Sequence, residues 1–340
     1  MRERPGAVTV RDVAARAGVA LSTVSNVLNR PQVVAPETLA RVTAAINELG
    51  YVRNDAARAL RLGQSRAVGM IVSEATSPFF ADVMQGASAV LAGGGYSTLL
   101  GNATQDVDVE SSLIELFESQ RVRGLLIAPS SDVPAGLASF EKRGVPVVFL
   151  DVPAPDRDHC SVAVDDARGG AIAVEHLLAQ GRSHIALVRG PRDLPQIRER
   201  SRGARAAAEA AGARFEVITT SSYFVQAGSE AAAVIASRSA GDRPDALFAV
   251  NDLLAMGTLT ALIDRGIGVP EDVALVGYDD ISVAAAARRP LTTVRQPARD
   301  IGARGAALLM AEMDGSGDHT HEQTLFSPEL VVRATSIVRH

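Results

Sequence analysis

The chain of 340 residues has few of the features that mark secreted, membrane-bound or disulfide-stabilised proteins. Cys160 is its only cysteine, which excludes an internal disulfide. No apolar run approaches the roughly 18 residues that a membrane span needs, and the N-terminal residues lack the apolar core of a secretion signal. We therefore expect a soluble, cytoplasmic protein.

Sequence signatures of several enzyme classes are also missing. The chain has no P-loop, no dinucleotide-binding fingerprint and no nucleophile elbow. The glycine-rich GGGY at residues 93–96 precedes an apolar run, which predicts a helix-to-strand turn. His319 and His321 are the closest pair of histidines, and no further nitrogen or sulfur ligands stand beside them at a set spacing. We predict no catalytic residue, no metal site and no cofactor.

Charge is distributed unevenly along the chain, whose formal net charge is −5. Residues 1–62 hold nine arginines and five acidic residues, a net +4, which leaves 25 basic and 34 acidic residues for the remainder, a net −9. A basic head on an acidic body indicates that only the head meets a polyanion. The length, with 47% hydrophobic residues, is enough for two or three cores.

The head begins with TVRDVAARAGVALSTVSNVLN at residues 9–29. Thr9 and Asp12 form a capping-box-like start, and Gly18 supplies a turn before a second helix from about Leu21 to Leu28. A third helix follows Pro36 and closes at Gly50. Three short helices with one core are the plan of a helix-turn-helix unit, whose second helix enters the major groove. Short polar side chains on that helix, Ser22, Ser25 and Asn26, are suited to bases or phosphates, and Leu21 to a thymine methyl group. A small structural bundle with a polar face is the alternative.

The head also resembles the lactose-repressor (LacI-type) family of bacterial transcription regulators, through VTVRDVAARAGVALSTVSNVLN and PETLARVTAAINELGYVRNDAARAL. The resemblance spans the chain and implies a hinge segment at NDAARAL, whose Leu60 wedges into the minor groove and kinks the duplex. Ala20 and Ala35 replace serines that usually cap helices in the family, so those two caps and phosphate contacts are not expected. The resemblance implies DNA contacts at Thr9, Leu21, Ser22, Ser25, Asn26, Asn29, Tyr51, Asn54, Ala57 and Leu60.

From about residue 66 the chain alternates continuous apolar runs with helical patterns. The runs AVGMIV, YSTLLGN, GLLIAP, VPVVFLD, HIALVRG, ALFAVN and VALVGYDD predict buried parallel strands in two doubly wound α/β lobes. Ligands of such sheets bind beyond the carboxyl ends of the strands. Polar residues follow these runs, among them Ser73, Ser130, Asp151, Asn251 and Asp279. Each alone is suited to helix capping, but their convergence from two lobes favours a cleft.

The family resemblance implies a body similar to periplasmic binding proteins, which closes on a small metabolite. It points to Ser77, Phe79, Asp151, Arg200, Tyr223, Asn251 and Asp279, to which the strand-end pattern adds Ser130. Carboxylates, amides and a bidentate arginine are suited to the adjacent hydroxyls of a sugar, and an aromatic ring can stack on it. Leu194 and Gln196 stand where the purine-responsive member carries an arginine and a threonine, which favours a sugar over a purine.

These observations predict a dimeric repressor, not an enzyme, that binds a near-palindromic operator under the control of an effector. We expect a DNA-binding domain at 1–52, a hinge helix and linker at 53–65, an N-terminal lobe of 66–163 with 297–325, and a C-terminal lobe of 164–296 with 326–340. No heptad repeat follows LVVRATSIVRH, so a C-terminal coiled-coil tetramer is not expected. A solute-binding protein of the same two-lobed fold is the alternative, with an α/β enzyme as a third possibility.

Overall fold

The computed structural model describes residues 8–51, 66–132, 134–315 and 319–337. It divides into two compact units, the first ending at Ser65 and the second beginning at Arg66. The described part of the first unit is the head, which consists of α1 (Val10–Ala17), α2 (Leu21–Asn29), the short 3-10 helix η1 (Pro31–Val33) and α3 (Pro36–Leu49). None of the described helices is both long and apolar enough to cross a membrane.

Local signals in the sequence account for the ends of the head helices. Thr9 and Asp12 form the predicted capping box, and Gly18 ends α1 in the left-handed conformation that glycine adopts at low cost. Ala20 and Ala35 make no side-chain caps, as predicted from the missing serines. The three helices share a core at their crossing, formed by Val13, Ala14, Ala17, Val24, Val27, Val42 and Ala45.

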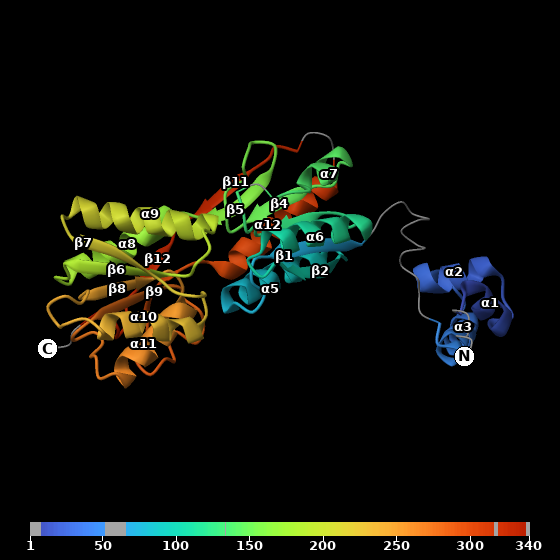
Figure 1. Ribbon diagram of the computed structural model, residues 1–340. Helices are drawn as coiled ribbons and strands as arrows, with labels where there is room; N and C mark the ends of the chain where they lie inside the picture. The colour runs from blue at the N-terminus through green and yellow to red at the C-terminus, as the bar shows by residue number, and fades with distance from the viewer. Residues whose placement is uncertain (1–7, 52–65, 133, 316–318, 338–340) are drawn as a thin grey trace, which may run out of the picture. The chain divides into compact units, whose positions relative to one another are not determined.

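The second unit, the body, contains two six-stranded sheets (Figure 1). Sheet 1 has the order β11-β5-β4-β3-β1-β2 and sheet 2 the order β12-β10-β9-β8-β6-β7. The strands of sheet 1 are β1 (Ala67–Val72), β2 (Ser97–Asn102), β3 (Leu125–Ile127), β4 (Val147–Leu150), β5 (Cys160–Val164) and β11 (Gln323–Phe326). Those of sheet 2 are β6 (His184–Arg189), β7 (Arg214–Thr219), β8 (Ala246–Ala249), β9 (Ala274–Asp279), β10 (Thr292–Arg295) and β12 (Glu329–Val331).

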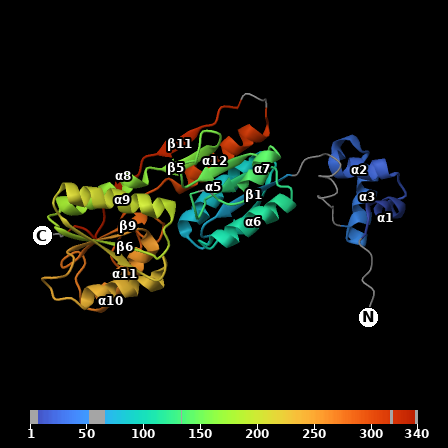
Figure 2. The same cartoon turned by 45° about the horizontal axis from the view of Figure 1, so that its top comes forward.

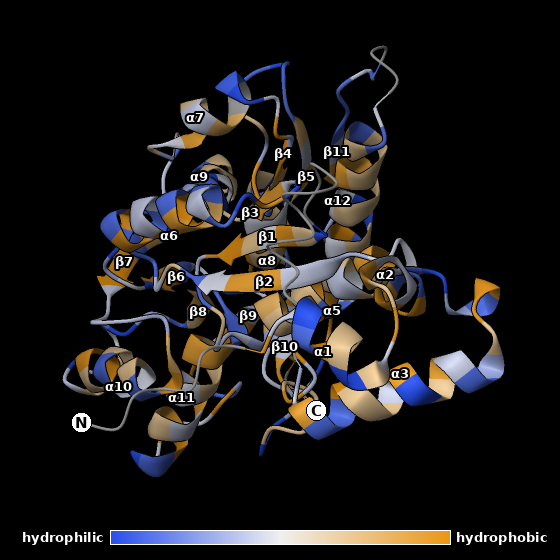
Figure 3. Cartoon of the chain, turned by 90° about the vertical axis from the view of Figure 1, so that its right-hand side faces the viewer, coloured by the Kyte–Doolittle hydropathy of each residue, from blue (hydrophilic) through white to orange (hydrophobic). Residues whose placement is uncertain are grey.

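Lobe 1, built on sheet 1, buries both faces of its sheet. Alternate residues of β1, Val68, Met70 and Val72, pack with α5 (Pro78–Gly93) and α12 (Ala298–Met313). Ile71 lies on the opposite face, with α6 (Val107–Ser119) and α7 (Leu137–Lys142). Figure 3 shows β1 mostly in the hydrophobic colour, whereas α6 carries both colours. Burial on both faces explains why these strands are continuous apolar runs.

Lobe 2, built on sheet 2, is layered in the same way. Helices α8 (Asp166–Ala179) and α9 (Pro195–Ala210) cover one face, and α10 (Gly228–Ala236) and α11 (Asp252–Asp264) cover the other, as Figures 1 and 2 both show. A short 3-10 helix, η2 (Val225–Ala227), precedes α10. One buried cluster runs through the lobe, with Phe248 and Tyr278 among its largest side chains.

The chain passes between the lobes three times. The crossings lie between β5 and α8, between β10 and α12, and between β11 and β12. Helix α12 and strand β11, although late in the sequence, therefore complete lobe 1.

Glycines allow the paired helices of each lobe to approach closely. A Cβ on Gly86 of α5 would lie 2.0 Å from the carbonyl oxygen of Arg299, and one on Gly302 of α12 would lie 1.9 Å from that of Val83. In lobe 2 the corresponding pair is Gly203 of α9 and Gly170 of α8, with distances of 1.8 and 2.0 Å to backbone oxygens. Both helix pairs thus depend on the missing side chain.

The sheets differ from the sequence prediction in two respects. Strands β5, β7, β10 and β11 were not among the predicted runs. The predicted runs all form parallel strands, as predicted, but at one edge of sheet 2 the additional strand β12 pairs with β10 in the antiparallel direction. Residues 93–96 form the predicted turn between α5 and β2.

Candidate functional site

The second helix of the head, α2, presents both polar and apolar side chains to solvent. Leu21 is 47% exposed, and Ser22 and Asn26 are exposed beside it. The Nδ2 of Asn29 donates to the backbone oxygen of Ser25 at 2.8 Å, which ties two predicted DNA contacts together. This helix offers the side chains that a major-groove reader needs.

The other predicted DNA contacts have different settings. Thr9 is exposed, and its hydroxyl donates to the carboxylate of Asp12 at 2.7 Å. Tyr51 is half-buried against the head core. Asn54, Ala57 and Leu60, with the predicted hinge at 53–65, lie outside the described residues.

A cavity lies between the two lobes of the body. It contains about 490 Å³ of space free of protein atoms, open solvent included. Its lining includes seven of the eight predicted effector residues: Ser77, Phe79, Asp151, Arg200, Tyr223, Asn251 and Asp279.

Ser130 is the exception among the predicted effector residues, because it does not line the cavity. It is buried after β3, and its backbone N–H donates to the carboxylate of Glu110 at 2.6 Å. The end of β3 therefore turns toward α6, and the rule that strand ends meet the ligand fails at this strand.

Arg200 anchors the lobe 2 wall of the cavity and is 3% exposed. Its Nε donates to Asp166 at 2.7 Å, its Nη1 donates to the backbone oxygen of Val250 at 2.9 Å, and its guanidinium lies 3.8 Å from the ring centre of Tyr278. Burial opposes the charge of Arg200, but the neighbouring acidic groups, Asp166 first, outweigh it and raise its pKa above the ordinary value. The result is a permanently charged donor whose position is fixed on three sides.

Asp279 and Asp151 supply buried carboxyl groups from opposite lobes. Burial raises the pKa of Asp279 to about 7, against the opposing effects of Arg200 and a hydrogen bond from Gln296. Burial also raises the pKa of Asp151 well above its usual value, and the charge of Asp166 adds to this. Both backbones have positive φ, 112° at Asp279 and 65° at Asp151, a conformation that non-glycine residues adopt mainly where the surroundings impose it.

The remaining predicted effector residues are held by local bonds. Asn251 caps α11 through its Oδ1 and donates from Nδ2 to the backbone oxygen of Tyr223 at 3.1 Å. The hydroxyl of Tyr223 donates to the backbone oxygen of Arg192. Ser77 stands at the N-cap position of α5 without making a side-chain cap, which leaves its hydroxyl available, and Phe79 packs edge-on against Phe80.

Several lining residues were not predicted as effector contacts. Gln196 is 7% exposed, and its Oε1 has no hydrogen-bond partner, a condition shared by the Oδ1 of Asp151. Gln196 follows the proline that opens α9, just as Phe79 follows the proline that opens α5, and this spacing was visible in the sequence. The others are Ser73, Glu74, Phe80, Gln105, Leu194, Ile197, Phe224 and Leu253.

Two ion pairs join the lobes. Arg192 lies 3.2 Å from Asp106, and Arg198 lies 2.5 Å from Asp132. All four side chains are at least one-third exposed, so each pair adds little to stability. Both pairs nevertheless connect residues of one lobe to residues of the other.

A helix-turn-helix head followed by a two-lobed body with a polar cavity defines a ligand-controlled DNA-binding protein. Comparison with known proteins agrees with this class. Residues 9–54 match the family described as "Bacterial regulatory proteins, lacI family", and residues 174–336 match "Periplasmic binding protein-like domain".

Similar proteins extend the match over the whole chain. The HTH-type transcriptional repressor PurR of Aliivibrio fischeri (strain MJ11) is 34% identical over 337 residues, which cover 97% of this chain and 99% of the relative. The ribose operon repressor of Bacillus subtilis (strain 168) is 35% identical, over 89% of this chain and 90% of the relative. The crystal structure of the lac repressor dimer bound to operator and the anti-inducer ONPF has a TM-score of 0.79 at 28% identity, covering 98% and 100% of the two chains.

The chain therefore belongs to the lacI family of bacterial regulatory proteins. It is a DNA-binding transcriptional regulator, and the resemblance inferred from the head and body motifs is confirmed.

Proposed function

We propose that this regulator is a repressor whose effector is a small sugar bound between the lobes. The observation that carries the effector class is the pair of buried oxygens without hydrogen-bond partners, Asp151 Oδ1 from lobe 1 and Gln196 Oε1 from lobe 2, in a cavity that also holds Arg200. Buried acceptors without partners are costly, and sugar hydroxyls would donate to both. Phe79 and Tyr223 add aromatic surface for a ring face. The ribose operon repressor among the relatives supports the same class.

We propose the domain division that the sequence predicts: a DNA-binding domain at 1–52, a hinge at 53–65, and lobes of 66–163 with 297–325 and 164–296 with 326–340. The lobe boundaries lie within a few residues of the three crossings, since Val164 and Phe326 still pair within sheet 1. Within the hinge we propose, from the family resemblance, that Asn54, Ala57 and Leu60 contact DNA and that Leu60 wedges between base pairs. Operators lie on the chromosome, so the protein acts in the cytoplasm.

A homodimer is the proposed assembly, and exposed apolar residues on the edges of both sheets support it. Leu99 and Leu100 of β2 are 36% and 50% exposed, and Leu116 of α6 is 48% exposed. In lobe 2, Val217 of β7 and Val234 of α10 are each 41% exposed. Exposed apolar edge strands favour pairing with another chain, and a two-fold dimer matches a near-palindromic operator.

We infer no catalytic role for the body. Asp166, Asp252 and Asp279 are engaged in hydrogen bonds with Arg200, Thr293 and Gln296, and of these three only Asp279 lines the cavity. The relatives are transcriptional repressors.

The test is selection of genomic fragments by the purified protein, repeated with a panel of pentoses, hexoses, disaccharides and purine bases. We expect one near-palindromic site whose occupancy changes with one sugar. Asp151→Ala should abolish this response and leave operator affinity without the sugar unchanged, whereas the exposed Asp158→Ala serves as the matched control. A response to a purine but to no sugar would contradict the effector class, and the absence of any enriched site would contradict the repressor.

The DNA-reading helix has a matched test of its own. Asn26→Ala should weaken operator binding by about 1–3 kcal/mol while changing non-specific binding little, because a bidentate base contact is lost. The exposed Asn47→Ala on α3 is the control. Equal losses on specific and non-specific DNA would contradict a base-reading role for Asn26.

A further inference from the structure

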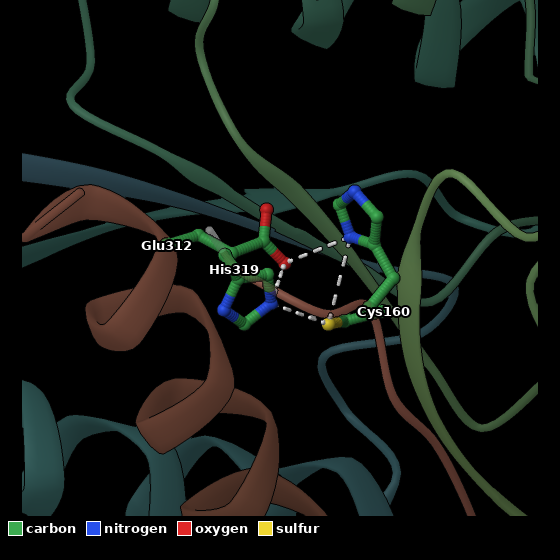
Figure 4. Close-up of side chains that lie close together, drawn as sticks. Cys160, Glu312 and His319 are labelled. Carbon is green, nitrogen blue, oxygen red and sulfur yellow. Dashed lines mark hydrogen bonds and ion pairs between the residues drawn. The ribbon is translucent and has the colours of Figure 1, made fainter. Parts of the chain in front are cut away.

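Four side chains of the kinds that bind transition metals converge in lobe 1, away from the effector cavity. They are Cys160 at the start of β5, Glu312 near the end of α12, and His319 and His321 shortly before β11. Figure 4 shows Cys160, Glu312 and His319 pointing toward one another. The lobe 1 residues that line the effector cavity follow the carboxyl ends of β1 and β4. Strand β5 is parallel to these strands, and Cys160 lies at its start, so the cluster lies at the opposite end of the strands of sheet 1.

The spacing of the four ligand atoms is close to that of a tetrahedral coordination shell and in places somewhat wider, so that small side-chain shifts would close it around one ion. The Sγ of Cys160 lies 3.3 Å from His319 Nε2 and 3.9 Å from His321 Nδ1. The Oε1 of Glu312 lies 3.5 Å and 3.7 Å from the same two nitrogen atoms, and all four atoms lie within 4.8 Å of one another. Bonds of about 2.0–2.3 Å from a tetrahedral Zn²⁺ place its ligand atoms roughly 3.3–3.8 Å apart.

Glu312 provides a further sign that a cation belongs at this position. Its side chain is 9% exposed, and its buried Oε1 makes no hydrogen bond of good geometry, its polar neighbours being the Cys160 thiol and the two histidine nitrogens at 3.5 and 3.7 Å. A buried carboxylate oxygen in this condition is costly unless a cation or a donor satisfies it. The two histidine nitrogens that face it are the other ligand atoms of the cluster, so one ion at the centre would satisfy all four groups.

We propose that Cys160, Glu312, His319 and His321 form a Zn²⁺ site with four protein ligands. Four protein ligands leave no open position, which is typical of structural zinc. The ion would join the C-terminal end of α12 and the 319–321 segment to β5, three parts of lobe 1 that are distant in sequence. Since α12 packs against α5 through Gly302 and Gly86, zinc would stabilise the helix pair that covers this face of sheet 1.

The sequence did not reveal this grouping of Cys160 and Glu312 with the two histidines, and the prediction of no metal site stays untested. Cys160 and His319 are 159 residues apart, so no local spacing marks the site. Only the pairing of β11 with β5 brings the two segments together.

Zinc binding by the full-length, tag-free protein is the direct test, with the bound metal measured after dialysis against a weak chelator. We expect one Zn²⁺ per chain, a rise in Tm on zinc addition, and, with Co²⁺ in its place, the absorption of a tetrahedral thiolate complex. Retention of far less than one Zn²⁺ per chain after dialysis, or a Co²⁺ spectrum without a thiolate band, would overturn the proposal.

Variants assign the ligands. His321→Ala, whose side chain is 33% exposed in the protein, is expected to fold and to lose at least about a hundredfold in zinc affinity, more than the 10–100-fold that second-shell changes cost. Cys160→Ser should in addition remove the thiolate band. Glu322→Gln is the matched control, because this neighbouring carboxylate pairs with Arg304 and is not one of the four ligands. Unchanged zinc affinity in His321→Ala would refute the site.

Discussion

The two lobes of the body share one scaffold but differ in the chemistry they bring to the cavity. Pro78 and Pro195 each open a 16-residue helix, and Gly86 and Gly203 are the ninth residues of those helices. At the sixth position lobe 1 has Val83 where lobe 2 has Arg200. The scaffold therefore fixes where a side chain stands, and the residue at that position decides whether it packs or binds.

The same comparison extends to the partner of Arg200. Asp166 is the first residue of α8, and the first residue of α12 in lobe 1 is Ala298. Lobe 2 thus has a buried ion pair where lobe 1 has two small apolar residues, and only lobe 2 brings a fixed positive charge to the effector. The aspartates at the cavity, Asp151 after β4 and Asp279 at the end of β9, remain equivalent in both lobes.

Breaking the ion pair tests this difference most strongly. Arg200→Met leaves Asp166 buried without its cation and should lower the free energy of unfolding by about 3–5 kcal/mol, with loss of effector binding. The double variant Arg200→Met/Asp166→Ala, which makes lobe 2 resemble lobe 1, should recover part of this loss because no uncompensated charge remains. Urea unfolding measures both, and Arg202→Met, at an exposed pair with Glu199, is the control. A double variant less stable than the single one would contradict the proposed cost of the unpaired carboxylate.

The shared helix packing predicts equal sensitivity in the two lobes. Gly203→Ala and Gly86→Ala should each destabilise by about 1–3 kcal/mol, since the new Cβ meets a backbone oxygen and the helices must separate. Gly93→Ala at the end of α5 meets no atom within 4 Å and should be close to neutral. Thermal unfolding compares the three, and a neutral Gly86→Ala beside a damaging Gly203→Ala would show that the lobes are not equivalent.

The titration of Asp279 distinguishes it from an ordinary exposed aspartate. Its pKa of about 7 in the folded protein exceeds the ordinary 3.8, so between these values the folded state binds more protons than the unfolded state. Stability attributable to this group is therefore present at low pH and falls as pH rises toward about 7, by at most about 1.4 kcal/mol per pH unit. Asp279→Asn cannot titrate, so the difference in unfolding free energy between it and the wild type should change between about pH 5 and about pH 7 and level off above. A constant difference across that range would contradict the raised pKa.

The ion pairs between the lobes should have the smallest effect. Arg198→Ala removes the contact with Asp132 and should cost about 0.2–1 kcal/mol, diminishing at high salt, because both side chains are exposed. The expected readout is a modest weakening of effector affinity, measured by calorimetry at low and high salt. Arg205→Ala, on the same helix but paired within it to Glu209, should leave the affinity unchanged. An equal effect of both variants would show that the pair between the lobes does not influence closure.

The sequence predicted those parts of the fold that continuous apolar runs mark. Central strands such as β1 and β8 are buried on both faces and were found, whereas β5, β7, β10 and β11 were missed because short or partly exposed strands with polar residues lack such a run. The antiparallel β12 could not be predicted, since strand direction depends on how the chain returns from lobe 1.

The cavity was predictable to a similar degree. Strand ends and the family resemblance located seven lining residues, but Ser130 fails because Glu110, from another element, holds the end of β3. Gln196 was not predicted because only the folded structure shows that its buried Oε1 lacks a hydrogen-bond partner. The cluster of Cys160, Glu312, His319 and His321 was not predicted because its residues come from segments that are distant in sequence. Interactions between remote segments are the part of the site that sequence patterns do not carry.

The order of synthesis gives the three crossings a further consequence. A nascent chain that has reached residue 297 contains every strand and helix of sheet 2 except β12, yet it lacks α12 and β11, and the α5 face of lobe 1 is uncovered. Domains usually fold in the order in which the ribosome delivers them. Here the lobe that begins first is completed almost last, so the apolar face of α5 must be protected until the final forty or so residues have emerged. A chain truncated within α12 would leave the apolar face of α5 in lobe 1 uncovered and prone to aggregation, although such a chain would contain nearly all of lobe 2.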